Sequence, residues 1–283
     1  MRVKWVGRWI PSAIAWSLAY FCTTETLELM IYYRLALAAL LVLGLAACKK
    51  EQEEDQHTHD HGGSGSPTAL NVRFNFTHGL NAFDINGIYA DGMGHAIRFS
   101  TLRFYASDFH LEDDGGATVA EFQDKVVLFD GATPNASFDL GTINGGHIHE
   151  VHFNLGLESS VNHADPLTAA YPLNIPGMHW SWNPAAGYKF LNMEGSVDGN
   201  GDGDFVDAED LTFTYHCATD ALLTADHFNL HQDANGGTLT LDAKLDVAVL
   251  LTGLDLLATP VAMGGGPNNV AAMNNLAAAI DEP

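Results

Sequence analysis

The sequence contains few cysteines and few basic residues, and each shortage narrows the range of functions. Only Cys48 and Cys217 follow the first 47 positions, out of three cysteines in 283 residues. If Cys48 carries lipid, as argued below, Cys217 has no partner for an internal disulfide and is interpreted as a buried apolar side chain rather than a ligand. The chain carries 12 Lys and Arg against 35 Asp and Glu, a formal net charge of −23. So acidic a surface argues against nucleic acid and anionic lipid as partners and favours cations.

Signatures of the common enzyme classes are missing as well. The sequence has no G-x-S-x-G turn, P-loop, dinucleotide fingerprint or H-E-x-x-H zinc-protease motif. Its acidic pairs do not single out a glycosidase-like dyad. We therefore predict that the protein is not an enzyme.

An apolar stretch at residues 35–45 indicates export rather than a membrane-spanning helix. It follows Arg34 and runs into Leu45-Ala46-Ala47-Cys48, so residues 30–48 have the charged, apolar and small-residue regions of a bacterial lipoprotein signal. The stretch is too short to span a bilayer. Cys48 is predicted to become the acylated N-terminus and the only membrane anchor. We expect the protein in the periplasm or at the cell surface, at the outer membrane of a Gram-negative bacterium.

The residues on either side of this signal are expected to lie outside the folded domain. Residues 1–29 fit no part of a signal, so we predict that Met30 is the initiator and that this segment is an over-extended start. Residues 49–67 are rich in Glu, Asp, His, Gly and Ser, which is typical of a disordered tether. Its alternating histidines at positions 57, 59 and 61 either scavenge metal weakly or belong to a plain polar linker. Residues 68–283 then form the domain.

The domain is predicted to be an all-β, antiparallel β-sandwich with long loops. Leu70, Val72, Phe74 and Phe76 alternate with polar residues, the pattern of a half-buried strand. Clusters of Gly, Asn, Asp and Pro separate the strand candidates, an arrangement typical of sandwiches. Helical periodicity is confined to a short closing helix at residues 268–280. The further strand candidates are residues 96–104, 125–129, 147–155, 188–193, 211–215 and 237–251.

Three histidines crowd one of these predicted strands. Alternation would place His147 and His149 on one face, and Glu150 and His152 on the other. Two imidazoles at i, i+2 can bind one ion together with ligands from other strands, although exposed strand histidines are also common. We predict copper, which leads the divalent affinity order at nitrogen ligands. The candidate copper ligands are His147, His149, His179, His152 and His216.

An acidic loop matches the calcium pattern D-x-[DN]-x-[DN]-G-x₅-E over residues 198–209. Its predicted flanks are strands, so it would be a calcium loop outside an EF-hand, with a structural role. The alternative is an acidic turn that binds nothing tightly. The candidate calcium ligands are Asp198, Asn200, Asp202, the carbonyl of Asp204 and Glu209.

The segment of residues 177–195 holds Trp180 and Trp182, the only two of five tryptophans that lie beyond the predicted signal. These side chains, with His179, indicate either a redox-active or metal-binding cluster or an aromatic group that packs against a sheet. Pro176 and Pro184 keep the first half of the segment out of regular structure.

At these residues the sequence resembles the MbnP-like family of copper-associated periplasmic or surface proteins. The most specific part is the W-x-W-N…GYkF…EG pattern of residues 180–195, and further similarity covers most of residues 69–260. It includes Leu102-Arg103-Phe104-Tyr105-Ala106-Ser107-Asp108, Val127-Leu128-Phe129-Asp130, residues 145–157, Asn162 and residues 213–216. A position that is tyrosine-like in the family is His147 here.

The resemblance implies a β-rich copper-binding domain. It also implies a di-haem peroxidase partner that oxidises a tryptophan to kynurenine, and in this chain only Trp180 or Trp182 could be the modified residue. A competing hypothesis is a calcium-dependent surface module for carbohydrate or a protein partner. That module would use Trp180, Trp182 and Tyr188 as an exposed aromatic platform.

Overall fold

The computed structural model describes residues 65–180 and 183–283, within a compact unit that spans Asp60–Pro283. The predictions for the N-terminal extension, the signal peptide, Cys48, nearly all of the tether and Trp182 lie outside the described residues. Among the described residues, no helix is long and apolar enough to cross a bilayer.

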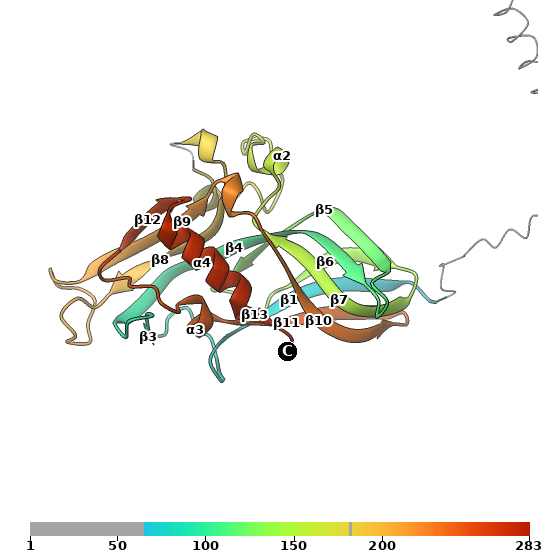
Figure 1. Cartoon of the computed structure of the whole chain (residues 1–283), viewed down its shortest axis with the longest axis horizontal. Coiled ribbons are helices and arrows are strands. Elements are labelled where there is room, and N and C mark those ends of the chain that lie inside the picture. The colour runs from blue at the N-terminus through green and yellow to red at the C-terminus, as the bar shows by residue number, and fades with distance from the viewer. Residues whose placement is uncertain (1–64, 181–182) are drawn as a thin grey trace, which may run out of the picture. The chain divides into compact units, whose positions relative to one another are not determined.

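Two β-sheets face each other (Figure 1). The five-stranded sheet has the order β13-β11-β1-β2, with β6 also paired to β1, and the eight-stranded sheet has the order β10-β7-β4-β8-β9-β12, with β3 and β5 also paired to β4. The smaller sheet consists of β1 (Thr68–His78), β2 (Asn81–Ala82), β6 (Ser137–Ile143), β11 (Gly237–Asp246) and β13 (Ile280–Asp281). The larger consists of β3 (Tyr89–Ala90), β4 (Ala96–Glu112), β5 (Thr118–Asp130), β7 (Gly146–Leu155), β8 (Lys189–Val197), β9 (Leu211–Ala218), β10 (Thr224–Ala234) and β12 (Val261–Gly264).

The predicted all-β sandwich is confirmed, but its sheets are mixed rather than purely antiparallel. β1 pairs in parallel with β11, and β12 pairs in parallel with β9. The short link after Ala234 carries the chain from β10 in the larger sheet to β11 in the smaller one, so these two strands do not form a hairpin. Because β11 is not the partner strand of β10, no hairpin turn sets its direction. Its direction in the smaller sheet is set by packing beside β1.

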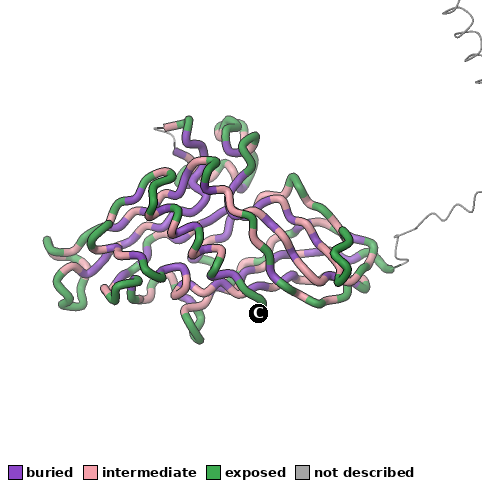
Figure 2. Tube along the Cα trace, viewed as in Figure 1, coloured by how far each residue is buried: buried purple, intermediate pink, exposed green. Residues whose placement is uncertain are grey.

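The core lies between the sheets, where aromatic rings from both interdigitate. On β1, Leu70, Val72 and Phe74 are fully buried, as the alternation predicts. The Phe74 ring stacks on Phe129 of β5, with 4.3 Å between centroids, and meets Phe228 of β10 edge-on at 6.0 Å. Each such side chain contributes about 1.5–3 kcal/mol by burial. Figure 2 shows this buried layer continuing along the strands of both sheets.

One long strand, β4, joins the two halves of the larger sheet. Its residues from Ile97 to Phe104 pair with β8, whereas those from Ala106 to Glu112 pair with β7. β5 pairs with β4 from Arg103 onward along the opposite edge. β7 and its neighbour β10 therefore lie at one end of β4, and β8 and its neighbour β9 lie at the other end. This separation decides which of the predicted ligands meet.

The helices are short and mostly occupy connections. α4 (Pro267–Ala279) is the predicted closing helix, and it packs against α3 (Val247–Leu250) and β9. The predicted strand at 237–251 was too long, because the Asp246 side chain accepts a hydrogen bond from the Ala248 amide and begins α3. The remaining helical turns are α2 (Ser159–Asn162), η1 (Pro176–Met178), η2 (Pro184–Ala186) and η3 (Asp220–Leu222).

Candidate metal centre

All the histidines of β7 point to the outward face of the larger sheet. Ile148, Val151 and Phe153 are buried, so the inward and outward alternation reverses between His149 and Glu150. The prediction that His152 lies on the face opposite His149 was therefore wrong. The reversal coincides with a β-bulge, where β10 has two residues, Leu230 and His231, opposite the single residue His149 of β7. His231 has a φ of 50°, in the left-handed region.

The bulge brings His231 to the two predicted ligands. The rings of His149 and His231 lie 4.1 Å apart between centroids, and those of His147 and His231 lie 6.2 Å apart. Asp114, in the turn after β4, reaches all three: its carboxylate oxygens lie 3.3 Å from His147 Nε2, 3.0 Å from His149 Nδ1 and 3.6 Å from His231 Nδ1. We call these four residues the histidine cluster. One ligand atom each from Asp114, His147 and His231 lies within 4.8 Å of the others.

A second carboxylate orients His147. Its Nδ1 lies 2.7 Å from Asp233 Oδ1, and this hydrogen bond raises the pKa of His147, with the charges of Asp114 and Asp233 also contributing against the cost of burial. Such an outer carboxylate fixes the ring and leaves the other nitrogen for an ion. Sequence reasoning missed Asp114, His231 and Asp233, because the first is in a turn and the other two belong to a strand that it did not predict.

The remaining predicted copper ligands lie elsewhere. His152 is further along β7, close to Glu112 and Glu150. His179 follows η1 and packs edge-on against the ring of Tyr188, at 5.0 Å, and burial lowers its pKa. His216 is on β9, which β4 and β8 separate from β7. The five predicted histidines are thus distributed over several places, and only His147 and His149 share one cluster.

His216 belongs to a buried polar group beside the tryptophan segment. The indole N–H of Trp180 donates to His216 Nδ1 at 3.3 Å, and His216 Nε2 lies 2.7 Å from Glu194 Oε1. Lys189 Nζ lies 3.2 Å from the same Nε2. Burial lowers the pKa of both Lys189 and His216. Burial opposes ionisation of Glu194, but the His216 hydrogen bond and the Lys189 charge outweigh it and hold the pKa of Glu194 below its usual value.

Two of the three residues of the predicted aromatic platform, Trp180 and Tyr188, are buried, which contradicts their exposure; the third, Trp182, lies outside the described residues. Trp180 is 4% exposed and Tyr188 is fully buried. Nearby, buried Asn162 accepts a hydrogen bond from the Tyr188 amide at 2.7 Å and donates one to Asp220 at 2.7 Å. Trp180 and Tyr188 therefore pack in the protein interior and cannot present flat rings to a sugar.

The acidic loop folds into a compact turn with a partly different set of carboxylates. Those of Asp202, Asp204 and Asp207 offer oxygens within 4.8 Å of one another, so Asp207 joins the set and Glu209 does not. The carboxylate of Asp198 accepts hydrogen bonds from two backbone amides of the loop, at 2.6 and 2.9 Å. Three carboxylates of the loop thus converge, and its first residue holds the turn together.

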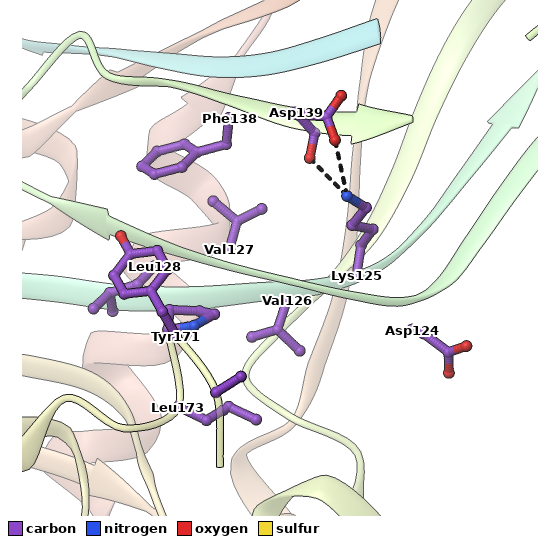
Figure 3. A pocket seen from close by; sticks show the side chains of 11 residues that line it. Asp124, Lys125, Val126, Val127, Leu128, Phe138, Asp139, Tyr171 and Leu173 are labelled. Atoms are coloured by element: carbon purple, nitrogen blue, oxygen red, sulfur yellow. Dashed lines mark hydrogen bonds and ion pairs between the residues drawn. The ribbon is translucent and has the colours of Figure 1, made fainter. Parts of the chain in front are cut away.

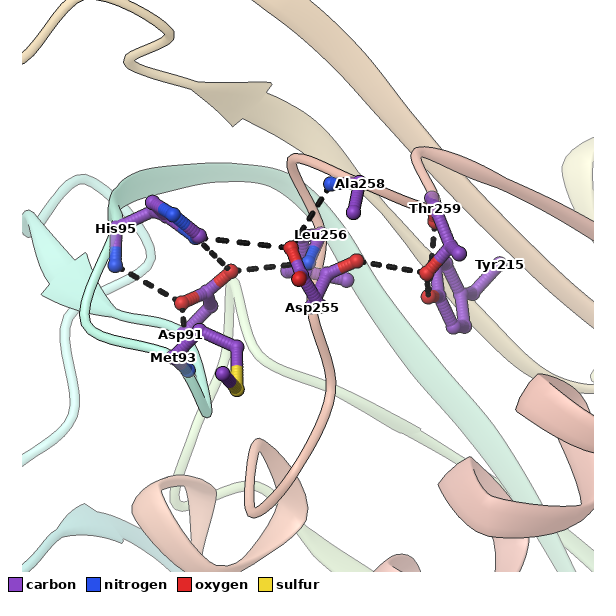
Figure 4. Close-up of polar contacts among 8 residues, drawn as sticks. All are labelled: Asp91, Met93, His95, Tyr215, Asp255, Leu256, Ala258 and Thr259. Carbon is purple, nitrogen blue, oxygen red and sulfur yellow. Dashed lines mark hydrogen bonds and ion pairs between the residues drawn. The ribbon is translucent and has the colours of Figure 1, made fainter.

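A third group of histidine and carboxylates serves as a structural latch (Figure 4). Asp91 is buried and accepts hydrogen bonds from the amides of Met93, His95 and Leu256, each at 2.9 Å. His95 Nδ1 lies 3.0 Å from Asp91 Oδ2 and 3.7 Å from Asp255 Oδ1. Because backbone donors already occupy the Asp91 carboxylate, this group ties two loops together.

A groove of about 520 Å³ lies at the edge of β5, β6 and the loop around Tyr171 (Figure 3). Phe138, Tyr171 and Leu173 form its apolar wall, and Lys125 pairs with Asp139 at 3.1 Å on its rim. None of its lining residues is a histidine, so it is separate from the histidine cluster.

Comparison with known proteins places these features in context. The model of the MbnP family matches residues 67–267. MbnP from Methylosinus trichosporium has a similar solved structure, with a TM-score of 0.50 at 20% sequence identity, covering 73% of this chain and 87% of that one. At this identity the structural match supports the fold alone. No curated protein matches the sequence.

Proposed function

The chain belongs to the MbnP family, and we propose that it is an extracytoplasmic copper-binding protein anchored by lipid on Cys48. The observation that carries the copper proposal is the histidine cluster. Three imidazoles, two from β7 and one from β10, converge on the carboxylate of Asp114 in the turn after β4, and these segments are far apart in the sequence. Imidazole nitrogens suit copper, zinc and nickel, and copper leads that order.

The cluster also satisfies the physical requirements for loading a metal. The side chains of His147, His149 and His231 are 35%, 26% and 58% exposed, so an ion can reach them from solvent. Their nitrogens now contact carboxylates, which would give way to or share the incoming cation. Asp233 would keep the His147 ring in place. Copper bound there is a cargo or a stored ion, because the proposed role includes no catalysis by this chain.

The copper proposal is tested by competitive titration of the mature protein with Cu(I) and Cu(II). The double variant His147→Ala/His149→Ala should lose the tightest copper equivalent, with an affinity at least roughly 100-fold weaker. The matched control is His78→Ala, since His78 lies on β1 in the other sheet, with its ring 4.6 Å from that of Tyr89 at an interplanar angle of 35°. Equal copper affinity in the wild type and the double variant would refute this placement.

We further propose that Trp180 is a substrate of a di-haem peroxidase partner that forms kynurenine. Supporting this, the indole N–H of Trp180 already donates to His216, whose other nitrogen contacts Glu194. Such a chain can accept the indole proton when the ring is oxidised. Peptide mapping of protein from the native host, with and without the partner gene, should show the mass change on the peptide that contains Trp180. An unmodified peptide in the presence of the partner would exclude it.

The acidic loop is proposed as a structural calcium site. The carboxylates of Asp202, Asp204 and Asp207 crowd one another, and burial raises the pKa of Asp207, with smaller contributions from the charges of Asp210, Glu209 and Asp202. A divalent cation would relieve this repulsion. Millimolar Ca²⁺ should raise the melting temperature of the wild type, and the Asp202→Asn/Asp207→Asn variant should lose that response. An identical shift in both would contradict the site.

The lipid anchor on Cys48 has its own test. The wild type should partition into the detergent phase and sediment with membranes, whereas Cys48→Ala should not acquire lipid. Fractionation with mass spectrometry of the mature N-terminus measures both properties. Membrane association of Cys48→Ala equal to that of the wild type would remove the anchor from the proposal.

A further inference from the structure

We propose a second metal centre on the same outward face, formed by His110, Glu112, Glu150 and His152, which takes a divalent cation such as Zn²⁺. It is distinct from the histidine cluster and does not depend on copper binding there. The two strands that supply the ligands are antiparallel neighbours, and their register places His110 opposite His152 and Glu112 opposite Glu150. Four ligating side chains thus form a rectangle across β4 and β7.

The distances within this rectangle suit a small cation. His152 Nε2 lies 2.9 Å from Glu150 Oε2 and 3.7 Å from Glu112 Oε2, and His110 Nε2 lies 3.0 Å from Glu112 Oε1. Ligand bonds of about 2.0–2.2 Å in a tetrahedron place neighbouring ligand atoms about 3.3 Å apart. The observed distances fall on both sides of this value. One ligand atom each from Glu112, Glu150 and His152 lies within 4.8 Å of the others.

An unsatisfied nitrogen gives an independent sign of a missing partner. His152 Nε2 is closed off from solvent and has no hydrogen-bond partner, despite its short distance to Glu150. The close approach therefore lacks the alignment that a hydrogen bond needs. A bound cation satisfies this nitrogen and the carboxylates together, because adjacent ligands of one ion are close without pointing at each other.

The charges of Glu112 and Glu150 also favour a bound cation. Glu112 and Glu150 stand directly opposite on adjacent strands, where like charges are destabilising. Within the described part of the chain, their ion-pair contacts come from the histidines His110, His149 and His152, and none comes from Lys or Arg. A divalent cation placed between the two carboxylates converts this repulsion into attraction.

Neighbouring residues hold the imidazoles in position. The His227 ring stacks on His152 with 5.1 Å between centroids and an 18° interplanar angle. Glu121 Oε1 lies 3.4 Å from His110 Nδ1, the ring nitrogen that faces away from the site. Such a carboxylate behind a histidine is typical of metal ligands. The ligand side chains are 28–36% exposed, whereas His152 Nε2 itself is closed off from solvent.

The donor set decides the class of ion. Two imidazoles and two carboxylates are borderline and hard ligands, which suit Zn²⁺ or Cu²⁺ and not the soft ion Cu(I). The histidine cluster has three imidazoles and one carboxylate, so the two sites differ in preference. They adjoin at Glu150, whose Oε1 lies 4.0 Å from Nε2 of His149.

The test uses Zn²⁺ titration of the mature protein by calorimetry. Glu112→Gln/Glu150→Gln should lose one equivalent, or bind it at least roughly 100-fold more weakly. The variant His147→Ala/His149→Ala should keep that equivalent. Asp124→Asn, an exposed carboxylate on β5, is the control for net charge. Retention of the equivalent by the double glutamine variant, or its absence from the wild type, would overturn the proposal.

A second measurement avoids dependence on the glutamine substitutions. In His147→Ala/His149→Ala, Co²⁺ should give the visible absorption bands of a four-coordinate nitrogen and oxygen site, and Zn²⁺ should abolish them. Bands that are absent, or that Zn²⁺ does not displace, would count against the site. Failure of the copper proposal would appear separately, as unchanged copper affinity in the same variant.

Discussion

Replacing Asp226 by asparagine should stabilise the protein at neutral pH but not in acid. Asp226 lies on β10, and its Oδ2 is closed off from solvent without a hydrogen-bond partner, whereas Oδ1 accepts a hydrogen bond from the His227 amide at 2.9 Å. Burial raises the pKa of this carboxyl to about 6, and the His227 amide and ring oppose the change only in part. A charge that is buried without a full set of partners destabilises the fold.

The pH dependence of this destabilisation follows from proton binding by Asp226 in the native and unfolded states. Between about pH 4 and 6 the native state keeps the Asp226 proton and the unfolded chain releases it, so stability falls as pH rises through this window. Above pH 6 the free-energy cost of the buried Asp226 carboxylate is fully present. Below pH 4 it vanishes, because Asp226 is protonated in both the native and the unfolded state. A shift of two pKa units corresponds to about 3 kcal/mol, which solvent screening at this partly exposed residue reduces to about 1–2 kcal/mol.

The assay is urea unfolding at pH 7.5 and pH 4.0, with a chelator present. Asp226→Asn should gain about 1–2 kcal/mol at pH 7.5 and show no gain at pH 4.0. Asp226→Leu is the second variant, because it also removes the unpaired polar group. Equal stability differences at the two pH values, or loss of stability by both variants at pH 7.5, would refute the reasoning.

Three further substitutions test the packing around the sites by the same unfolding assay. Asp91→Asn should cost about 3 kcal/mol, because the amide cannot accept the hydrogen bonds that reach both carboxylate oxygens, including that from Leu256; a loss below 1 kcal/mol would contradict the latch. Gly195→Ala should cost about 3 kcal/mol, since its Cβ would lie 2.1 Å from a carbonyl of β4, while Gly177→Ala, whose Cβ would meet only a side-chain nitrogen of Arg103 at 3.9 Å, should be neutral. Asn162→Ala should cost about 2 kcal/mol by leaving the amide of the tryptophan segment unpaired, and unchanged stability would show that this bond is dispensable.

Part of the sandwich was predictable because some strands, above all β1, alternate strictly between buried and half-buried residues. β1 follows the alternation along its length, and the closing helix was predicted within one residue of α4. β10 was not predicted, because only Phe228 and Ala234 along it are buried, so its sequence resembles a polar loop. The parallel pairing of β1 with β11 also has no local signal, since it results from a crossing between sheets.

The histidine pair His147 and His149 could be found from sequence, but the site around it could not. His231 joins through a bulge, and a bulge changes the face of neighbouring residues without any motif in the sequence. Strict alternation also placed His152 on the wrong face, since the alternation of β7 reverses beside this bulge. The pairing of His110 with His152 depends on the register of β4 against β7, which non-local packing sets.

The separation of the histidine cluster from the tryptophan segment bears on how the two proposals are related. Trp180 is held by His216 on β9, whereas His147 is on β7, and β4 and β8 lie between these strands. Copper at the cluster would therefore take its ligands without contribution from a modified Trp180. The proposed copper site and the proposed tryptophan modification would thus be independent of each other, and protein lacking the modification should still bind copper at His147 and His149.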